Sequence, residues 1–348
     1  MTGKTSLFTI LTGVHQETRI GSTAVRTGVT KVPDPRLDEL ARIFDPPKIT
    51  SASVEYADMP SISKEVLRDP SYLATLRVVD AFAHVLRFFK SESVPHEKGS
   101  VDPVRDLEDV ETELILSDLV VVEKRLERLD KDRKKIKSPD LDHEFVLLEK
   151  CKAELEENRP LRNLALDHDE EKRVRGFQFL SQKPMLFVLN LDESDVGRMH
   201  ECEEEFRKST LAGRANTEAT AICGKVEAEL AELPPEEAAE FLAGFGLEES
   251  GLVRLIGATY RLQGLMSFLT AGETEVRAWT VPIGSTAQKA AGAIHSDFEK
   301  KFIRAEVVNW KNLVDLKGYP GVKEKGLLRL EGKEYIIKDG DVLVIRHG

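Results

Sequence analysis

The chain has 348 residues, of which 41% are hydrophobic and 32% are charged, and its formal net charge is -11 at pH 7. This length predicts two or three domains with packed cores. The negative charge argues against a protein that coats nucleic acid through its overall field, but it is compatible with a local basic patch.

The cysteines and the apolar runs indicate the compartment. The sequence contains 3 cysteines, an odd number, with neither a metal-binding spacing nor a disulfide framework, as expected in a reducing cytoplasm. No apolar run approaches the roughly 20 residues that span a bilayer. The N-terminus lacks the charged and apolar regions of a signal peptide. We therefore expect a cytoplasmic protein with no membrane contact.

The first candidate site is the string GKTS at Gly3–Ser6, which apolar residues follow at helical positions. A complete phosphate-binding loop reads G-x-x-x-x-G-K-[ST] and follows a buried strand, whereas only Met1 and Thr2 precede Gly3 here. If this string binds phosphate, the backbone amides at the start of the helix and the Lys4 side chain would contact phosphate oxygens. The Thr5 hydroxyl would bind Mg²⁺. The alternative is a chance occurrence of these residue types.

Two further polar residues lie beside predicted strands. Asp58 ends the strand-like run SVEYAD, where it would hold Mg²⁺ through a water or, alternatively, cap a turn. The apolar run DAFAHVLRFF at residues 80–89 predicts a strand buried on both faces, as in a parallel sheet. His96 follows it in a polar loop, where it is either catalytic or merely solvated.

A charged helical pattern begins at Asp102-Pro103 and is broken at Ser138-Pro139, after which a second amphipathic helix follows. Two long helices joined by a short turn predict an antiparallel helical hairpin. Its charges are either a solvated face or a docking surface for phosphate backbone. The basic residues at the expected tip are Lys131, Arg133, Lys134, Lys135 and Lys137.

The best predicted strand, Met185–Leu189, ends at Asn190. Ligands of open α/β sheets bind at the carboxyl ends of strands, so Asn190 and Glu193 are candidates for gripping a nucleobase edge. A polar loop after a strand is the alternative. Because this strand continues the α/β pattern, we interpret the hairpin as an insertion into one α/β domain. From about residue 273, several strands and one helix predict a β-grasp module.

Together these strings resemble the YchF family, the Obg-like ATPases of the TRAFAC class of P-loop NTPases. The resemblance rests on the strings VPDPRLDELARIF, VDPVRDLEDVETELILSDL, GLEESGLVRLI, AGETEVRAWTVPIGSTAQKAAGAIHSDFEKKFIRAEVV and YIIKDGDVLVIR. It implies an α/β P-loop NTPase fold with a mostly parallel sheet, an inserted helical hairpin and a C-terminal β-grasp (TGS) domain. The implied domains are a nucleotide-binding domain of residues 1–105 and 180–272, a helical coiled-coil insertion of 106–179, and a TGS domain of 273–348.

The resemblance also implies residue roles. Asn190 and Glu193 match an N-x-x-E sequence that is associated with acceptance of ATP as well as GTP. The implied nucleotide-binding residues are Gly3, Lys4, Thr5, Ser6, Asn190, Leu191 and Glu193. The implied Mg²⁺ ligands are Thr5, Thr23 and Asp58, and the implied catalytic residues are His96 and Lys4.

Several family features are missing or altered. The family loop begins five residues before Gly3, and its preceding strand is absent from the sequence. After Asp58, Ser61 replaces a glycine and Pro60 has no amide proton. The glycine-rich segment that usually follows is largely deleted. We therefore expect weak or lost hydrolysis. The sequence leaves open how the sheet compensates for the missing strand; an empty position would expose backbone groups to water or to another chain.

Two functions follow from these features. The first is a cytoplasmic ATP- or GTP-binding protein of the ribosome or translation, which hydrolyses nucleotide weakly or not at all to a nucleoside diphosphate and phosphate. The second is a nucleotide-independent protein that docks on the ribosome or its RNA through the helical arm and the TGS domain. No specific DNA partner is expected, and the sequence leaves the oligomeric state open.

Overall fold

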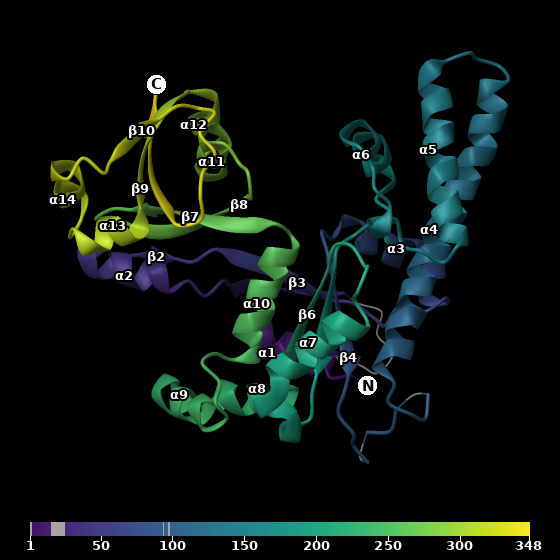
Figure 1. The fold of residues 1–348 in the computed structure, drawn as a ribbon, viewed down its shortest axis with the longest axis horizontal. Coiled ribbons are helices and arrows are strands. Elements are labelled where there is room, and N and C mark those ends of the chain that lie inside the picture. Colours follow the sequence, from purple (N-terminus) through teal and green to yellow (C-terminus); the bar gives the residue numbers. More distant parts are fainter. Residues whose placement is uncertain (1, 15–24, 93, 97) are drawn as a thin grey trace. The chain divides into compact units, whose positions relative to one another are not determined.

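The computed structural model describes residues 2–14, 25–92, 94–96 and 98–348. The chain divides into two compact units (Figure 1). Unit 1 comprises Met1–Arg26 and Ala57–Ala258, and unit 2 comprises Thr27–Tyr56 and Thr259–Gly348. The domain limits expected from the sequence differ from these units and remain a prediction.

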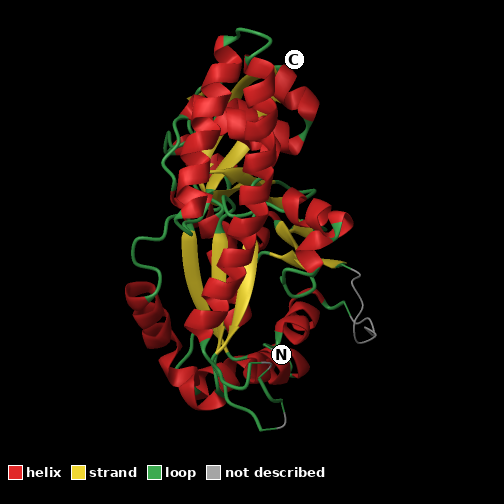
Figure 2. Ribbon diagram, turned by 90° about the vertical axis from the view of Figure 1, so that its right-hand side faces the viewer, coloured by secondary structure: helices red, strands yellow, loops and turns green. Residues whose placement is uncertain are grey.

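Unit 1 combines helices with a parallel sheet (Figure 2). Its helices and strands are α1 Lys4–Thr12, α3 Pro70–Val78, β4 Phe82–Arg87, α4 Pro103–Arg133, α5 Pro139–Glu156, α6 His168–Val174, β5 Met185–Asn190, α7 Met199–Ser209, β6 Thr217–Ile222, α8 Gly224–Glu232 and α9 Pro235–Gly244. Helix α10 (Gly251–Leu262) begins in unit 1 and ends in unit 2. Short 3₁₀ helices are η1 Val66–Arg68, η2 Leu161–Asn163, η3 Arg175–Phe177 and η4 Glu193–Arg198.

The sheet of unit 1 has the order β4-β5-β6, and both strand pairs are parallel. All residues of β5 are buried, as its uninterrupted apolar sequence predicts for a central parallel strand. The register aligns Arg87, Asn190 and Ile222 at the carboxyl ends of the three strands. The expected fold class is therefore confirmed, and Asn190 lies at the edge where such sheets bind ligands.

Among the described residues, β4 pairs with β5 alone, so its other edge has no strand partner. Two strands that precede β4 in the sequence, β1 (Arg26–Lys31) and β3 (Ser53–Asp58), form a separate two-stranded sheet. The described residues thus contain no strand that joins β4 to β3.

The predicted helical hairpin is formed by α4 and α5, which lie side by side (Figure 1). Asp102 caps α4 by accepting a hydrogen bond from the Arg105 amide at 3.1 Å, and Pro103 occupies the first helical position. The interface of the two helices is apolar. Its fully buried members include Val122, Leu129, Leu148 and Cys151.

The base of the hairpin is fastened by Asp118 of α4. Its two carboxylate oxygens accept hydrogen bonds from the backbone amides of Leu180 at 2.9 Å and Ser181 at 2.7 Å. Burial raises the pKa of Asp118 to about 6, although these hydrogen bonds oppose that shift. The contact fixes α4 against the segment that leads into β5.

Unit 2 contains a six-stranded mixed sheet of order β10-β9-β11-β7-β8-β2. Alternate residues of β7 and β8 face two different apolar clusters, so helices cover both faces of this sheet. Its remaining elements are α2 Pro35–Phe44, β2 Ile49–Thr50, β7 Leu265–Ala271, β8 Val276–Pro282, α11 Ala287–Ile294, α12 Ser296–Lys300, β9 Phe302–Asn309, α13 Trp310–Asp315, α14 Tyr319–Glu324, β10 Arg329–Glu331 and β11 Asp341–His347.

Arg36 fastens the early segment of unit 2 to its C-terminal part. Its guanidinium donates to both carboxylate oxygens of Asp34, at 2.7 and 2.8 Å, and to Asp339 at 2.8 Å. Asp339 lies in the turn before β11, next to Gly340. Gly340 has φ +79°, and a β-carbon there would lie 2.6 Å from Trp310 Cδ1, so the turn requires glycine.

In the part of the chain that the structure describes, no helix has the length and apolar character needed to cross a membrane.

Arg36→Ala should destabilise unit 2, because it removes a bidentate ion pair and the link to Asp339. We expect the free energy of unfolding to fall by about 1–3 kcal/mol. Both tryptophans, Trp279 and Trp310, belong to unit 2, so the tryptophan fluorescence of urea-treated protein reports its unfolding.

The matched control is Arg42→Ala, whose side chain is 71% exposed and pairs with Glu39 on the same helix. It should change stability by less than about 0.5 kcal/mol. Equal effects of the two substitutions would show that Arg36 does not fasten the unit.

Candidate functional site

The start of α1 presents a set of backbone donors. Gly3 precedes the helix with φ 87°, a left-handed conformation that glycine adopts without strain. The Leu7 amide donates to the Gly3 carbonyl at 3.0 Å, which closes the first turn. By helix geometry, the amides of Lys4, Thr5 and Ser6 have no acceptor within the helix, and the helix dipole adds positive potential there. These amides suit an anionic ligand.

Asn190, at the end of β5, holds this helix start in place. Its Nδ2 donates to the Thr2 carbonyl at 2.9 Å, and its Oδ1 accepts from the Gly224 amide at 2.9 Å. A β-carbon on Gly3 would lie 2.6 Å from Asn190 Nδ2, so Gly3 is required for this approach as well as for its φ. One side chain thus joins the loop before α1, the end of β5 and the start of α8.

Asp58, at the end of β3, lies among three donors. Thr5 Oγ1 donates to Asp58 Oδ2 at 3.2 Å, and an Arg26 guanidinium N–H donates to the same oxygen. Lys4 Nζ lies 3.3 Å from Asp58 Oδ1 and donates to the Met59 carbonyl. The Asp58 and Arg26 side chains are each only 6% exposed. The Asp58 carboxylate is therefore a buried anion shared by two cations.

Two of the expected nucleotide-binding residues, Glu193 and Leu191, have different environments in the structure. Glu193, the first residue of η4, forms an ion pair with Lys225 of α8 at 2.6 Å, and this hydrogen bond raises the pKa of Lys225. The Leu191 side chain instead lies in the core of unit 1 and is 2% exposed. Only the backbone of Leu191 is therefore available to a ligand at this edge.

Gly224 and Lys225 are site residues that the sequence analysis missed. Gly224 donates to Asn190, and Lys225 binds Glu193. Their position shortly after β6 could have pointed to them. Since β6 pairs with β5 in parallel, both strands end at the same edge of the sheet. A lysine after a short strand is too common to be selected from the sequence alone.

His96 is held more firmly than a solvated loop histidine. Its Nε2 lies 2.9 Å from Asp106 Oδ2, and the Lys98 amide donates to its Nδ1 at 3.1 Å. Since Nδ1 accepts a hydrogen bond, the neutral ring carries its proton on Nε2 and donates it to Asp106. The side chain is 10% exposed. In this arrangement both ring nitrogens are occupied.

His84 of β4 is a second histidine near these groups, and the sequence analysis did not select it. Burial lowers the pKa of His84 to about 4, with a smaller lowering by the charge of Lys4 and an opposing effect of Asp106. Its Nδ1 is buried without a hydrogen-bond partner. His84 therefore lies within electrostatic reach of both the Lys4 and the Asp106 clusters.

Two of the residues expected to bind Mg²⁺, Thr5 and Asp58, lie side by side in the structure. Mg²⁺ requires close to octahedral oxygen coordination. Asp58 Oδ2 accepts hydrogen bonds from Arg26 and Thr5. Asp58 Oδ1 is buried without a hydrogen-bond partner, 3.3 Å from Lys4 Nζ, so this oxygen has lone pairs for a metal ion or its bound water. Thr23 lies outside the described residues. Within the described ranges, no group of three or more His, Cys, Asp or Glu side chains is placed to hold a metal.

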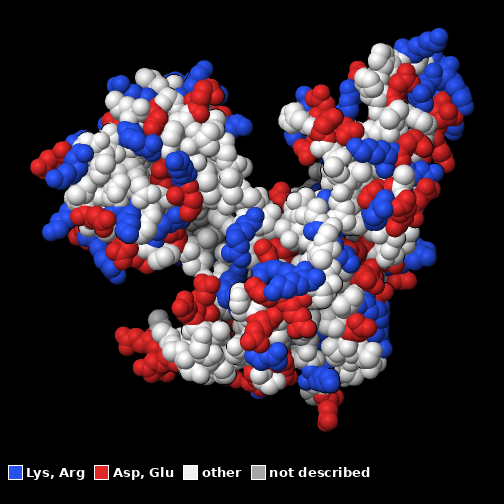
Figure 3. Space-filling model, viewed as in Figure 1, with Lys and Arg blue, Asp and Glu red and all other residues white. Residues whose placement is uncertain are grey.

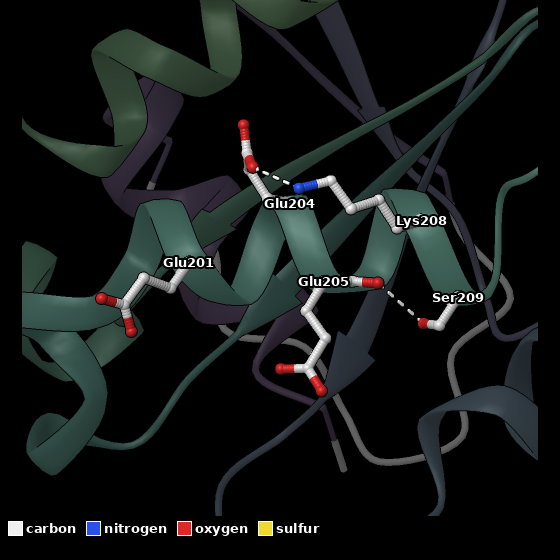
Figure 4. Close-up of a pocket in the computed structure, with 5 residues that line it drawn as sticks. All are labelled: Glu201, Glu204, Glu205, Lys208 and Ser209. Carbon is white, nitrogen blue, oxygen red and sulfur yellow. Dashed lines mark hydrogen bonds and ion pairs between the residues drawn. The ribbon is translucent and has the colours of Figure 1, made fainter.

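One surface hollow lies away from these residues. It measures about 490 Å³ and is lined by Glu201, Glu204, Glu205, Lys208 and Ser209, which all belong to α7 (Figure 4). Glu204 pairs with Lys208 at 2.7 Å, and Ser209 Oγ donates to the Glu205 carbonyl at 2.8 Å. Its polar groups satisfy one another along a single helix, so this hollow is not the candidate site.

Comparisons with known proteins converge on one family. Residues 265–348 match a family model described as YchF-GTPase_C, a protein of unknown function (DUF933). A protein named ribosome-binding ATPase YchF from Haemophilus ducreyi is 41% identical over 353 residues, covering 99% of this chain and 96% of the relative. A protein of the same name from Bacillus subtilis is 39% identical, with 99% and 96% covered. The solved structure of the Schizosaccharomyces pombe YchF GTPase has a TM-score of 0.84 and 27% identity, covering 99% of this chain and 95% of that one.

His84→Phe should remove a source of acid instability. Because the folded chain binds the His84 proton less tightly than the unfolded chain, this residue's contribution is complete above pH 6.5 and is lost as the pH falls toward 4. We expect the variant to gain up to about 3 kcal/mol relative to wild type between pH 6.5 and 4.

The check is chemical denaturation at a series of pH values, monitored by circular dichroism. His143→Phe, at an exposed position of α5, is the control and should follow wild type. A constant difference between His84→Phe and wild type over this pH range would contradict the assignment.

Proposed function

Because this chain belongs to the YchF family of P-loop NTPases, we propose that it binds ATP or GTP at the start of α1 and acts at the ribosome in the cytoplasm. The relatives named above are ribosome-binding ATPases by their names. Their similarity extends over nearly the whole chain, so the proposal does not depend on one motif.

The observation that carries the proposal is the pair of hydrogen bonds made by Asn190. They bring the unpaired amides of α1 next to the loops that follow β5 and β6. Phosphates would bind the amides of Lys4, Thr5 and Ser6. The base would bind against the edge formed by Asn190, Glu193, Gly224 and Lys225.

The polar groups of this second region suit a nucleobase. The Asn190 amide has two N–H donors, and one of them is used on Thr2. We assign the second to a ring nitrogen of the base. The Glu193 carboxylate would accept from an exocyclic amine, and Lys225 would move aside or donate to the base. Adenine and guanine both offer such groups, so ATP and GTP are both included.

We propose that hydrolysis is weak or absent. Both nitrogens of His96 are occupied, so neither is available to orient a water unless the contact with Lys98 or Asp106 is broken. Lys4 is bound to Asp58 and the Met59 carbonyl, and it must turn to reach a phosphate. Pro60 has no amide to offer a γ-phosphate. If both side chains rearranged, Lys4 would stabilise the transferring phosphoryl group, and a water held by His96 would attack it to give a nucleoside diphosphate and phosphate.

Ribosome contact would use the tip of the α4–α5 hairpin. Figure 3 shows basic side chains gathered at that end of the helices, where the sequence has Lys131, Arg133, Lys134, Lys135 and Lys137. Arg133 pairs with Asp142 at 2.6 Å and Lys134 with Asp130 at 2.5 Å, which reduces their share of the local charge. The remaining three lysines are exposed and suit phosphate backbone. This patch also supports the second candidate function, ribosome or RNA docking without nucleotide.

Calorimetric titration with a non-hydrolysable ATP analogue separates the two functions. We expect micromolar binding that weakens at least about tenfold in Lys4→Ala, because the variant loses a cation at the phosphate site. Lys208→Ala on the surface of α7 is the matched control and should bind as wild type does.

If the folded protein shows no binding heat with ATP or GTP in this titration, the nucleotide proposal is contradicted. It would leave a docking protein built on the fold of an NTPase.

A further inference from the structure

The turn after Asp58, residues 59–61, presents a carbonyl oxygen to the lysine of the proposed phosphate site. Lys4 Nζ donates to the Met59 carbonyl and lies 3.3 Å from Asp58 Oδ1, a buried oxygen without a hydrogen-bond partner. In a phosphate-binding loop, this lysine contacts the β- and γ-phosphates. Here two oxygen atoms of the chain itself lie beside the ammonium group, in the role that phosphate oxygens have in such a complex.

The same turn is poor in N–H donors. A trans peptide unit directs its carbonyl oxygen and the following N–H in opposite directions. The nitrogen that follows the Met59 carbonyl belongs to Pro60 and carries no proton. A flip of this peptide unit would therefore bring no donor to a phosphate beside Lys4. A γ-phosphate that approaches from this side meets an acceptor, which repels it, in place of a donor.

Contacts with the core of unit 1 hold the turn in this orientation. Tyr72 of α3 donates its hydroxyl to the Pro60 carbonyl at 2.8 Å. Burial raises the pKa of Tyr72 to about 12, so the hydroxyl keeps its proton at neutral pH. The Ser61 N–H shares its peptide unit with the Pro60 carbonyl, so Tyr72 fixes the direction of this donor too. The Met59 and Ile62 side chains pack against the same apolar core as Tyr72, and turning the segment toward a ligand would break these contacts.

The inner and outer phosphates of a nucleotide meet different groups at this site. The amides of Lys4, Thr5 and Ser6 suit the α- and β-phosphates, because they have no acceptor within the helix. Binding there requires no change in the Lys4 side chain. A γ-phosphate would instead take Lys4 from Asp58 and Met59, so the new ion pair replaces contacts that already exist. The net contribution of the γ-phosphate to affinity is therefore small.

We infer that this site does not distinguish the γ-phosphate, and that the chain binds a nucleoside diphosphate at least as tightly as the triphosphate. This inference rests on the nucleotide site proposed above. It names the diphosphate as a ligand class of that site, and the Met59 carbonyl, Pro60 and Tyr72 as the groups that set the preference.

The experiment measures how ADP and a non-hydrolysable ATP analogue displace a fluorescent ADP analogue from the full chain, in buffer with MgCl₂. For wild type we expect the dissociation constant of ADP to agree with that of the ATP analogue within about threefold, or to be lower. A site that gained affinity from γ-phosphate contacts would instead favour the ATP analogue.

Pro60→Gly tests the role of the turn. It restores an N–H behind the Met59 carbonyl and removes the restriction on φ, so that this peptide unit can flip and donate to a γ-phosphate. One hydrogen bond to a charged group corresponds to about tenfold in affinity. The variant should therefore bind the ATP analogue about tenfold more tightly than ADP, while its affinity for ADP stays as in wild type.

Tyr72→Phe is a second variant, which removes only the hydroxyl that holds the Pro60 carbonyl. The ratio of the two affinities should shift toward the ATP analogue by about threefold, because the Ser61 N–H is then free to turn. The matched control is Tyr319→Phe in unit 2, which loses a hydroxyl that donates to the Ala271 carbonyl at 3.1 Å and should bind both nucleotides as wild type does. Circular dichroism checks that each variant is folded, and Tyr72→Phe keeps the test valid if Pro60→Gly is not.

Three results would overturn the inference. If wild type binds the ATP analogue more than about threefold more tightly than ADP, the γ-phosphate is recognised. If the ratio of affinities is the same as in wild type for both Pro60→Gly and Tyr72→Phe, the turn does not set the preference. If wild type binds neither nucleotide, the proposed nucleotide site is itself contradicted, and this outcome is distinct from the first two.

Discussion

The two hydrogen bonds of the Asn190 side chain are the constraint on which the candidate site depends. They fix the segment before α1 and the start of α8 to the carboxyl end of β5. Because Asn190 lies so close to Gly3, a side chain at that position is excluded, and the helix starts with the left-handed turn that only glycine adopts readily. The unpaired amides of α1 therefore lie at the edge where a parallel sheet binds its ligands.

The sequence predicts those parts of the structure that local patterns encode. The apolar run of β5, the amphipathic periods of α4 and α5, and the polar residues Asp58 and Asn190 at strand ends were all predicted. The partners of these residues were not, because Arg26 with Asp58 and Lys225 with Glu193 meet only through the tertiary fold. The family string around Arg36 likewise gave no sign that it would bind Asp339, a residue distant in sequence.

The surroundings of the Leu191 and His96 side chains also depend on the tertiary fold. Leu191 was assigned to the nucleotide with its neighbours, yet its side chain packs into the core, since a residue that follows a buried strand still lies over the apolar layer. The sequence left His96 either catalytic or merely solvated, and in the structure Asp106, in the first turn of α4, accepts its hydrogen bond. The start of the helical hairpin therefore holds the His96 side chain, a coupling that spacing along the chain does not reveal.

The central claim is that the first turn of α1 and the loops joined by Asn190 bind one nucleotide. Hydrogen–deuterium exchange with and without a non-hydrolysable ATP analogue tests it directly, because amides without an acceptor exchange quickly until a ligand binds them. We predict slower exchange in peptides that cover Lys4–Leu7 and Gly224–Lys225, and no change in β7–β11 of unit 2. Unchanged exchange at both segments, or protection confined to unit 2, would contradict the account.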